Sequence, residues 1–93
     1  MTGTIENELL DYYHNFCERT IWFKKIVLQA NPQHPITIQD ITEEFIIERN
    51  RILQYVIPAN RRKIRSKLNK IATGYYYRIT HWSRKQRITV DMV

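Results

Sequence analysis

Apolar side chains recur at steps of three and four residues along the first third of the chain. The positions that form this stripe are Leu9, Tyr13, Phe16, Thr20, Phe23, Val27 and Ala30. Such spacing places side chains on one face of a helix, because an α-helix completes a turn in about 3.6 residues. The pattern predicts a long N-terminal helix over residues 5–29.

A second helix is predicted over residues 39–57. Its clearest inward positions are Ile41, Phe45, Ile52 and Val56. Pro32 and Pro35 separate it from the first helix, because proline cannot continue a helical hydrogen-bond ladder. Pro58 ends it, and residues 36–38 are expected to form a short strand before it.

A third helix is predicted over residues 60–73, where cations alternate with apolar residues. Asn60 is a suitable N-cap, and Gly74 is expected to end the helix. The apolar stripe consists of Ile64, Leu68 and Ile71. Because that stripe must face a core, the polar and basic remainder of this helix is expected to face solvent.

After Gly74 the pattern is interpreted as a period of two, which is typical of strands. Tyr77 and Ile79 then share one face of a first strand, and Ile88, Val90 and Met92 share a face of a second. Residues 83–86 are a suitable tip. The interpretation predicts a C-terminal β-hairpin over residues 75–92.

Charge is distributed very unevenly along the chain. Residues 1–48 carry three Lys or Arg against eight Asp or Glu, whereas residues 49–93 carry twelve against one. The net charge of +6 therefore divides into −5 and +11. A field polarised in this way favours docking of a polyanion on the basic half. The alternative is a solvated basic face that only aids solubility.

The third predicted helix has the arrangement expected of a helix in a DNA groove. Advancing about 100° per residue places Arg62, Ser66 and Asn69 opposite the apolar stripe, where they are expected to read base edges. The flanking cations are expected to hold phosphates. These are Arg61, Lys63, Arg65, Lys67 and Lys70.

A basic amphipathic helix followed by a basic hairpin resembles the second half of winged helix-turn-helix DNA-binding domains. The resemblance implies a small α+β winged-helix-like domain spanning residues 1–93, with three helices before the C-terminal hairpin. It implies a recognition helix within residues 61–73 and a wing within residues 75–92. The basic residues of that wing are Arg78, Arg84, Lys85 and Arg87.

Residues 37–56 also resemble the helix-turn-helix pattern itself, with Thr42 at the small-residue position and Ile46 at the turn. Arg49, Asn50, Arg51 and Gln54 would then reach the bases. A continuous helix explains the same residues without placing a β-branched side chain where turns favour glycine.

Several bulky side chains of the first helix lie off its main stripe. They are Leu10, Tyr12, Ile21, Trp22 and Ile26. Either a small domain wraps this helix on several sides, or the helix forms a homodimer interface. The second possibility fits operator-binding proteins, whose two-fold symmetry places two recognition helices about one turn of DNA apart.

The sequence contains no recognisable catalytic or cofactor motif. Cys17 is the single cysteine, and it lies three residues from His14 without a second ligand cluster. No glycine-rich phosphate loop and no apolar run of about 18 residues occurs. These features favour an intracellular protein that is not an enzyme and has no metal or cofactor.

The composition suits an AT-rich genome, such as that of a phage, virus or plasmid.

The expected function is sequence-specific binding of double-stranded DNA by a homodimer, most simply as a small transcriptional regulator. One alternative is a phage-type inhibitor or adaptor whose basic face meets an acidic protein. Another is RNA or single-strand binding, in which exposed rings of the hairpin stack bases. Those rings are Tyr75, Tyr76, Tyr77 and Trp82.

Overall fold

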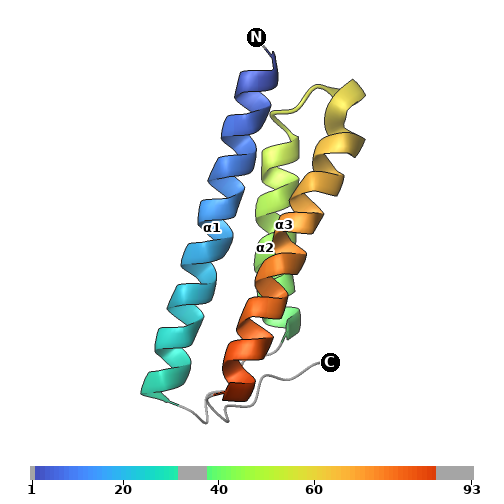
Figure 1. The fold of residues 1–93 in the computed structure, drawn as a ribbon. Coiled ribbons are helices and arrows are strands. Elements are labelled where there is room, and N and C mark those ends of the chain that lie inside the picture. The colour runs from blue at the N-terminus through green and yellow to red at the C-terminus, as the bar shows by residue number, and fades with distance from the viewer. Residues whose placement is uncertain (1, 32–37, 86–93) are drawn as a thin grey trace.

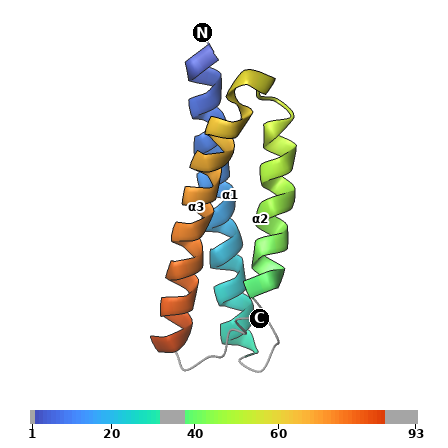
Figure 2. The same cartoon turned by 90° about the vertical axis from the view of Figure 1, so that its right-hand side faces the viewer.

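The computed structural model describes residues 2–31 and 38–85, and these form three helices. They are α1 (Thr2–Ala30), α2 (Ile38–Leu53) and α3 (Pro58–Lys85). Consecutive helices run antiparallel, so α1 and α3 point the same way and α2 points back between their ends (Figures 1 and 2). All three pairs of helices are in contact, which makes the fold a three-helix bundle.

One hydrophobic core runs along the axis of the bundle. Its largest fully buried side chains include Tyr13, Leu28, Phe45, Ile64 and Leu68. Each such Leu or Ile side chain contributes about 1.5–3 kcal/mol relative to exposure. On α3 the buried residues recur at steps of three and four, as one helical face requires. They are Ile64, Leu68, Ala72, Tyr75, Ile79 and Ser83.

An aromatic cluster joins the three helices at mid-height. Phe45 of α2 stacks on Tyr76 of α3 with ring centroids 5.1 Å apart. Tyr13 and Phe16 of α1 meet the same Phe45 edge-to-face, at 6.4 and 6.3 Å. Each such aromatic pair adds about 0.5–1.5 kcal/mol beyond area burial. The cluster therefore fixes how the helices pack at this level.

The predicted α+β fold with a C-terminal hairpin is wrong, because α3 continues through Gly74 to Lys85. No strand occurs in residues 2–31 and 38–85. Tyr77 and Ile79 were expected on one face, yet Tyr77 is 72% exposed and Ile79 is fully buried. Tertiary packing overrides the strand preference of aromatic and β-branched residues here, because the helical stripe of α3 faces the core along its length. Residues 86–92 of the predicted hairpin lie outside the described residues.

Two other expectations near α2 also change. The helix-turn-helix alternative required a turn at Ile46, but α2 is one continuous helix through that residue. Of the predicted short strand, Ile38 belongs to α2, and residues 36 and 37 lie outside the described part of the chain. Nothing in the bundle therefore supplies the winged-helix architecture.

The junction between α2 and α3 is held by a side chain from the basic helix. Arg61 donates from Nε to the carbonyl oxygens of Leu53 and Val56, at 3.1 and 3.0 Å. These carbonyls lie at and just beyond the C-terminal end of α2, where backbone acceptors lack helical partners. α3 begins at Pro58, a favourable first residue because its missing N–H would have no partner there. Asn60 donates to Glu6 Oε1 at 2.7 Å and so ties the start of α3 to α1.

Candidate nucleic-acid interface

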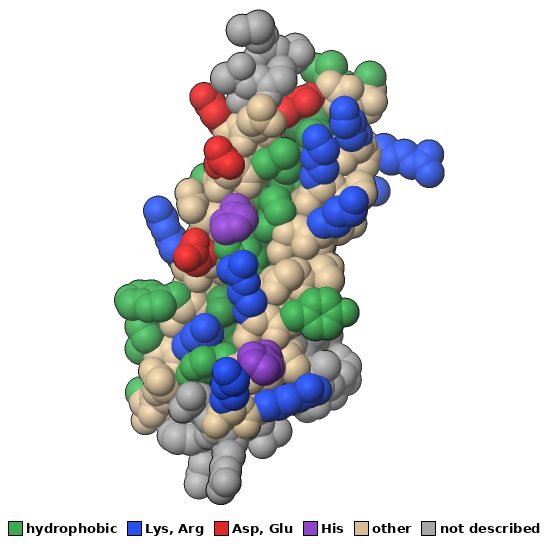
Figure 3. Space-filling model, viewed as in Figure 1, with side chains coloured by type: hydrophobic (Ala, Val, Ile, Leu, Met, Phe, Trp, Pro, Cys, Tyr) green, Lys and Arg blue, Asp and Glu red, His purple; other side chains and the backbone are tan. Residues whose placement is uncertain are grey.

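α3 is the basic element of the bundle. It carries nine Lys or Arg and no Asp or Glu, and all nine cations are exposed. α1 and α2 together carry eight carboxylates against five cations. In Figure 3 carboxylates gather over the upper part of α1, and cations gather over α3 beside them. The charge asymmetry of the sequence is thus displayed as one basic helix on an otherwise acidic bundle.

A shallow hollow of about 420 Å³ lies on the N-terminal half of α3. It is lined by Arg62, Arg65, Ser66, Asn69, Lys70 and Thr73. The three residues predicted to read bases therefore lie together. Three of the six side chains that line the hollow are cations. Lys63 and Lys67, predicted to hold phosphates, are exposed on the same helix outside this hollow.

Asn69 has a partner that sequence analysis did not anticipate. Its Oδ1 accepts a 2.9 Å hydrogen bond from Nη1 of Arg49, which comes from α2. Arg49 also donates to Asn50 Oδ1 from Nε and Nη2. Asn recognises adenine through both its oxygen and its nitrogen. Reading a base in this way therefore requires Arg49 to release the oxygen.

Arg61 differs from the other cations assigned to phosphates. Its Nε is engaged at the end of α2, as described above. It also does not line the hollow. Arg61 therefore has a structural role at the junction of the two helices, one that depends on tertiary contacts and has no signal in the sequence.

The residues predicted for a wing lie instead on the C-terminal half of α3. Arg84 and Lys85 occupy its last turn, where cations interact favourably with the helix dipole. Arg78 sits over the ring of Tyr75, with its guanidinium carbon 4.8 Å from the ring centroid. Arg87 lies outside the described residues. The cations from Arg62 to Arg84 therefore extend along about 33 Å of one helix, at 1.5 Å per residue.

The three consecutive tyrosines divide between core and surface. Tyr75 is buried and shares a 2.8 Å hydrogen bond with His14 Nδ1, and Tyr76 joins the aromatic cluster. Tyr77 is 72% exposed. Continuing the 100° step through Gly74 would have placed it in a row with Ser66, Lys70 and Thr73. Tyr77 is therefore a surface residue of the basic face that the strand interpretation concealed.

Other chemistry is sparse in the described part of the chain. Burial raises the pKa of the Cys17 thiol to about 12, so it stays protonated at neutral pH and is a poor nucleophile or metal ligand. Within residues 2–31 and 38–85, no three His, Cys, Asp or Glu side chains converge as a metal ion requires. None of the helices in these ranges combines the length and apolarity needed to cross a membrane.

Comparison of the chain with protein-family models, with curated protein sequences and with solved structures found no match.

Proposed function

We propose that the protein binds duplex DNA through the outward face of α3. The observation that carries this proposal is that all nine cations of α3 are exposed on a helix without a carboxylate. Phosphate neutralisation by Lys and Arg supplies most of the affinity of non-specific DNA binding. Carboxylates on the same surface would repel the backbone, and within residues 2–31 and 38–85 they occur only on α1 and α2.

The shape of α3 also suits this role. An α-helix with its side chains is about 10–12 Å wide, and the major groove of B-DNA is about 12 Å wide. Ser66 and Thr73 are short polar residues beside the long side chains of Arg62 and Lys70. In a groove, short residues allow the helix to approach the base edges while long cations reach phosphates on either side.

Binding to a site selected from a random library tests both the face and the residue roles. We expect Arg62→Ala and Asn69→Ala each to weaken binding to the selected site by about 1–3 kcal/mol, with smaller losses on random duplex. Lys63→Ala should weaken binding to all sequences alike. Arg51→Ala, which removes an exposed cation from α2 outside both the hollow and α3, is the control and should leave affinity unchanged. Equal losses on both DNAs for Arg62, Asn69 and Lys63 variants would contradict the assignment of base readers.

A second candidate function, binding of single-stranded nucleic acid, is favoured by Tyr77. Its ring lies in the row of Ser66, Lys70 and Thr73, and an exposed aromatic ring among cations is suited to base stacking. Stacking on such a ring is worth about 1–3 kcal/mol per base. Competition between a duplex and a single strand of equal length, repeated with Tyr77→Ala, separates the two functions. Preference for the single strand that disappears in Tyr77→Ala would favour this second function.

A further inference from the structure

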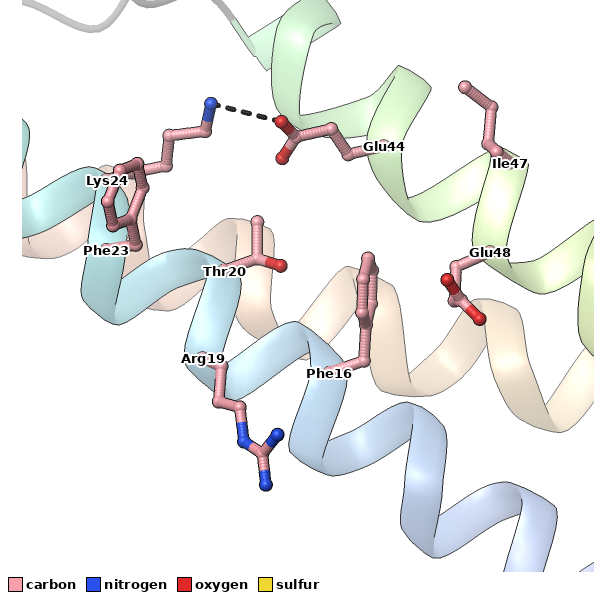
Figure 4. Close-up of a pocket in the computed structure, with 8 residues that line it drawn as sticks. All are labelled: Phe16, Arg19, Thr20, Phe23, Lys24, Glu44, Ile47 and Glu48. Atoms are coloured by element: carbon pink, nitrogen blue, oxygen red, sulfur yellow. Dashed lines mark hydrogen bonds and ion pairs between the residues drawn. The ribbon is translucent and has the colours of Figure 1, made fainter.

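An apolar groove lies between α1 and α2, away from the basic helix. It has a volume of about 500 Å³ and is lined by Phe16, Arg19, Thr20, Phe23, Lys24, Glu44, Ile47 and Glu48. None of these residues belongs to α3. Figure 4 shows the α1 and α2 side chains on the two walls, with the 3.2 Å ion pair between Lys24 and Glu44 across one end.

Large apolar side chains are exposed on the two helices that form this groove. Trp22 is 65%, Phe23 59% and Ile26 41% exposed on α1, and Ile47 is 68% exposed on α2. Scattered apolar residues are normal on a surface, but exposed apolar residues that line a groove are typical of an interaction site. Of these four residues, Phe23 and Ile47 line the groove, one from each wall.

A row of partly buried and exposed residues on α1 follows a heptad-like spacing. Tyr12, Phe16, Phe23 and Ile26 form a second row beside the buried row, with Arg19 at the intervening position. Steps of four, three, four and three residues are those that pack one helix against another in a coiled-coil-like seam. The groove side of α1 is therefore patterned for a further helix.

The charges of α1 indicate which helix fits this seam. Its first half carries Glu6, Glu8 and Asp11 and no cation, whereas in its second half Arg19, Lys24 and Lys25 outnumber the single carboxylate of Glu18. A second α1 in antiparallel orientation would place each acidic half against a basic half, whereas a parallel one would pair like charges. Complementary charge gives specificity and orientation to an interface. In a dimer with two-fold symmetry, each contact between the acidic half of one α1 and the basic half of the other occurs twice.

We propose that two copies of the chain associate through this groove, with their α1 helices antiparallel. The groove is walled by α1 and α2 only, so the basic faces of α3 stay outside the interface. Dimerisation and nucleic-acid binding therefore use separate surfaces, and failure of one proposal does not decide the other.

Sedimentation equilibrium of the full chain tests association directly. We expect a mass of twice 11.4 kDa for the wild type. Phe23→Glu and Ile47→Glu should each give a monomer with unchanged helical circular dichroism. The matched control is Tyr77→Glu, which places the same charge at an exposed aromatic position on α3 and should stay dimeric.

Three results would overturn the proposal. One is a wild-type monomer throughout the micromolar range. Another is a dimer that Tyr77→Glu dissociates and Phe23→Glu does not, because association would then occur through α3. The third is a monomer that dimerises only after residues 86–93 are removed, which would assign the groove to the C-terminal segment of the same chain.

Disulfide trapping tests the orientation. Glu8→Cys and Ile26→Cys lie in opposite halves of the exposed side of α1, and the native Cys17 is buried. In an antiparallel pair, mixing the two variants and oxidising them should give a cross-linked heterodimer, while neither variant alone cross-links. Self-cross-linking of Ile26→Cys without the mixed product would show a parallel pair and contradict the proposal.

Discussion

Arg49 on α2 and Asn69 on α3 are joined by a 2.9 Å hydrogen bond from the guanidinium Nη1 to the amide Oδ1. This contact places a cation from a second helix at the edge of the basic hollow. It also holds the side chain of a predicted base reader before any ligand arrives. Its consequence for DNA binding can be measured.

Arg49→Met keeps the aliphatic stem but removes both the cation and the donor to Asn69. We expect weaker binding to random duplex, because one positive charge near the phosphates is lost. Discrimination between a selected site and random duplex should not fall, since Asn69 gains freedom to pair with a base. The ratio of the two affinities, measured by fluorescence anisotropy, checks this. A collapse of the ratio, as expected for Asn69→Ala, would contradict it.

Gly74→Ala should stabilise the protein by about 0.5–1 kcal/mol, because glycine inside an exposed helix costs conformational entropy. A Cβ at this position would meet no atom within 4 Å. Urea unfolding followed by circular dichroism measures the change. Destabilisation would contradict the continuous helix, because it is the result expected where glycine ends a helix in a left-handed conformation.

Tyr13→Phe should lower the free energy of unfolding by about 1 kcal/mol. The Tyr13 hydroxyl is buried and donates to the carbonyl oxygen of Phe45 at 2.9 Å, which links α1 to α2. A buried hydrogen bond of this kind contributes about 0.5–1.5 kcal/mol. Tyr77→Phe removes an exposed hydroxyl and is the control, with no change expected. Equal effects of the two substitutions in urea unfolding would show that the buried bond contributes nothing.

The fold should lose stability at alkaline pH. Burial raises the pKa of Cys17 from 9.0 to about 12, and burial also raises that of Tyr13. The unfolded thiol loses its proton near pH 9 while the folded one keeps it to about pH 12. The contribution of this protonated thiol to the free energy of unfolding is therefore fully present below pH 9. It declines as the pH rises toward 12. Melting temperatures from pH 7 to 11 test this.

Cys17→Ala is the matched control for the alkaline effect. It should reduce the loss of melting temperature between pH 9 and 11, leaving the part that Tyr13 contributes. Native wild type should also react slowly with a thiol reagent and quickly in denaturant, because Cys17 is fully buried. A pH profile identical in wild type and Cys17→Ala would contradict the role of this thiol.

Segments that were predicted to be helical from the spacing of their apolar residues are helical in the structure. The predicted segments 5–29 and 60–73 lie within α1 and α3, and 39–57 extends four residues beyond the end of α2. The second half of α3 could not be derived from local preferences. Gly74 is typical of a helix end, and the residues after it favour strands, so only packing against the other helices makes them helical.

The candidate site, too, could be predicted from the sequence only in part. The positions of Arg62, Ser66 and Asn69 on one side of a helix follow from the 100° step alone. Tyr77 was named only as one of four rings that could stack bases; its place in the row of Ser66, Lys70 and Thr73 was missed because its segment was interpreted as a strand. The contacts of Arg61 with the end of α2 and of Arg49 with Asn69 join different helices. Such contacts depend on how the bundle packs, which no local pattern in the sequence specifies.

The most direct test of the central proposal is fluorescence anisotropy of a labelled random duplex of about 30 base pairs, titrated at several salt concentrations. If α3 neutralises about five to eight phosphates, the logarithm of the binding constant should fall linearly with the logarithm of salt, with a slope of about −4.5 to −7. Absence of binding at low salt, or a slope near zero, would contradict the assignment of α3 as a nucleic-acid interface.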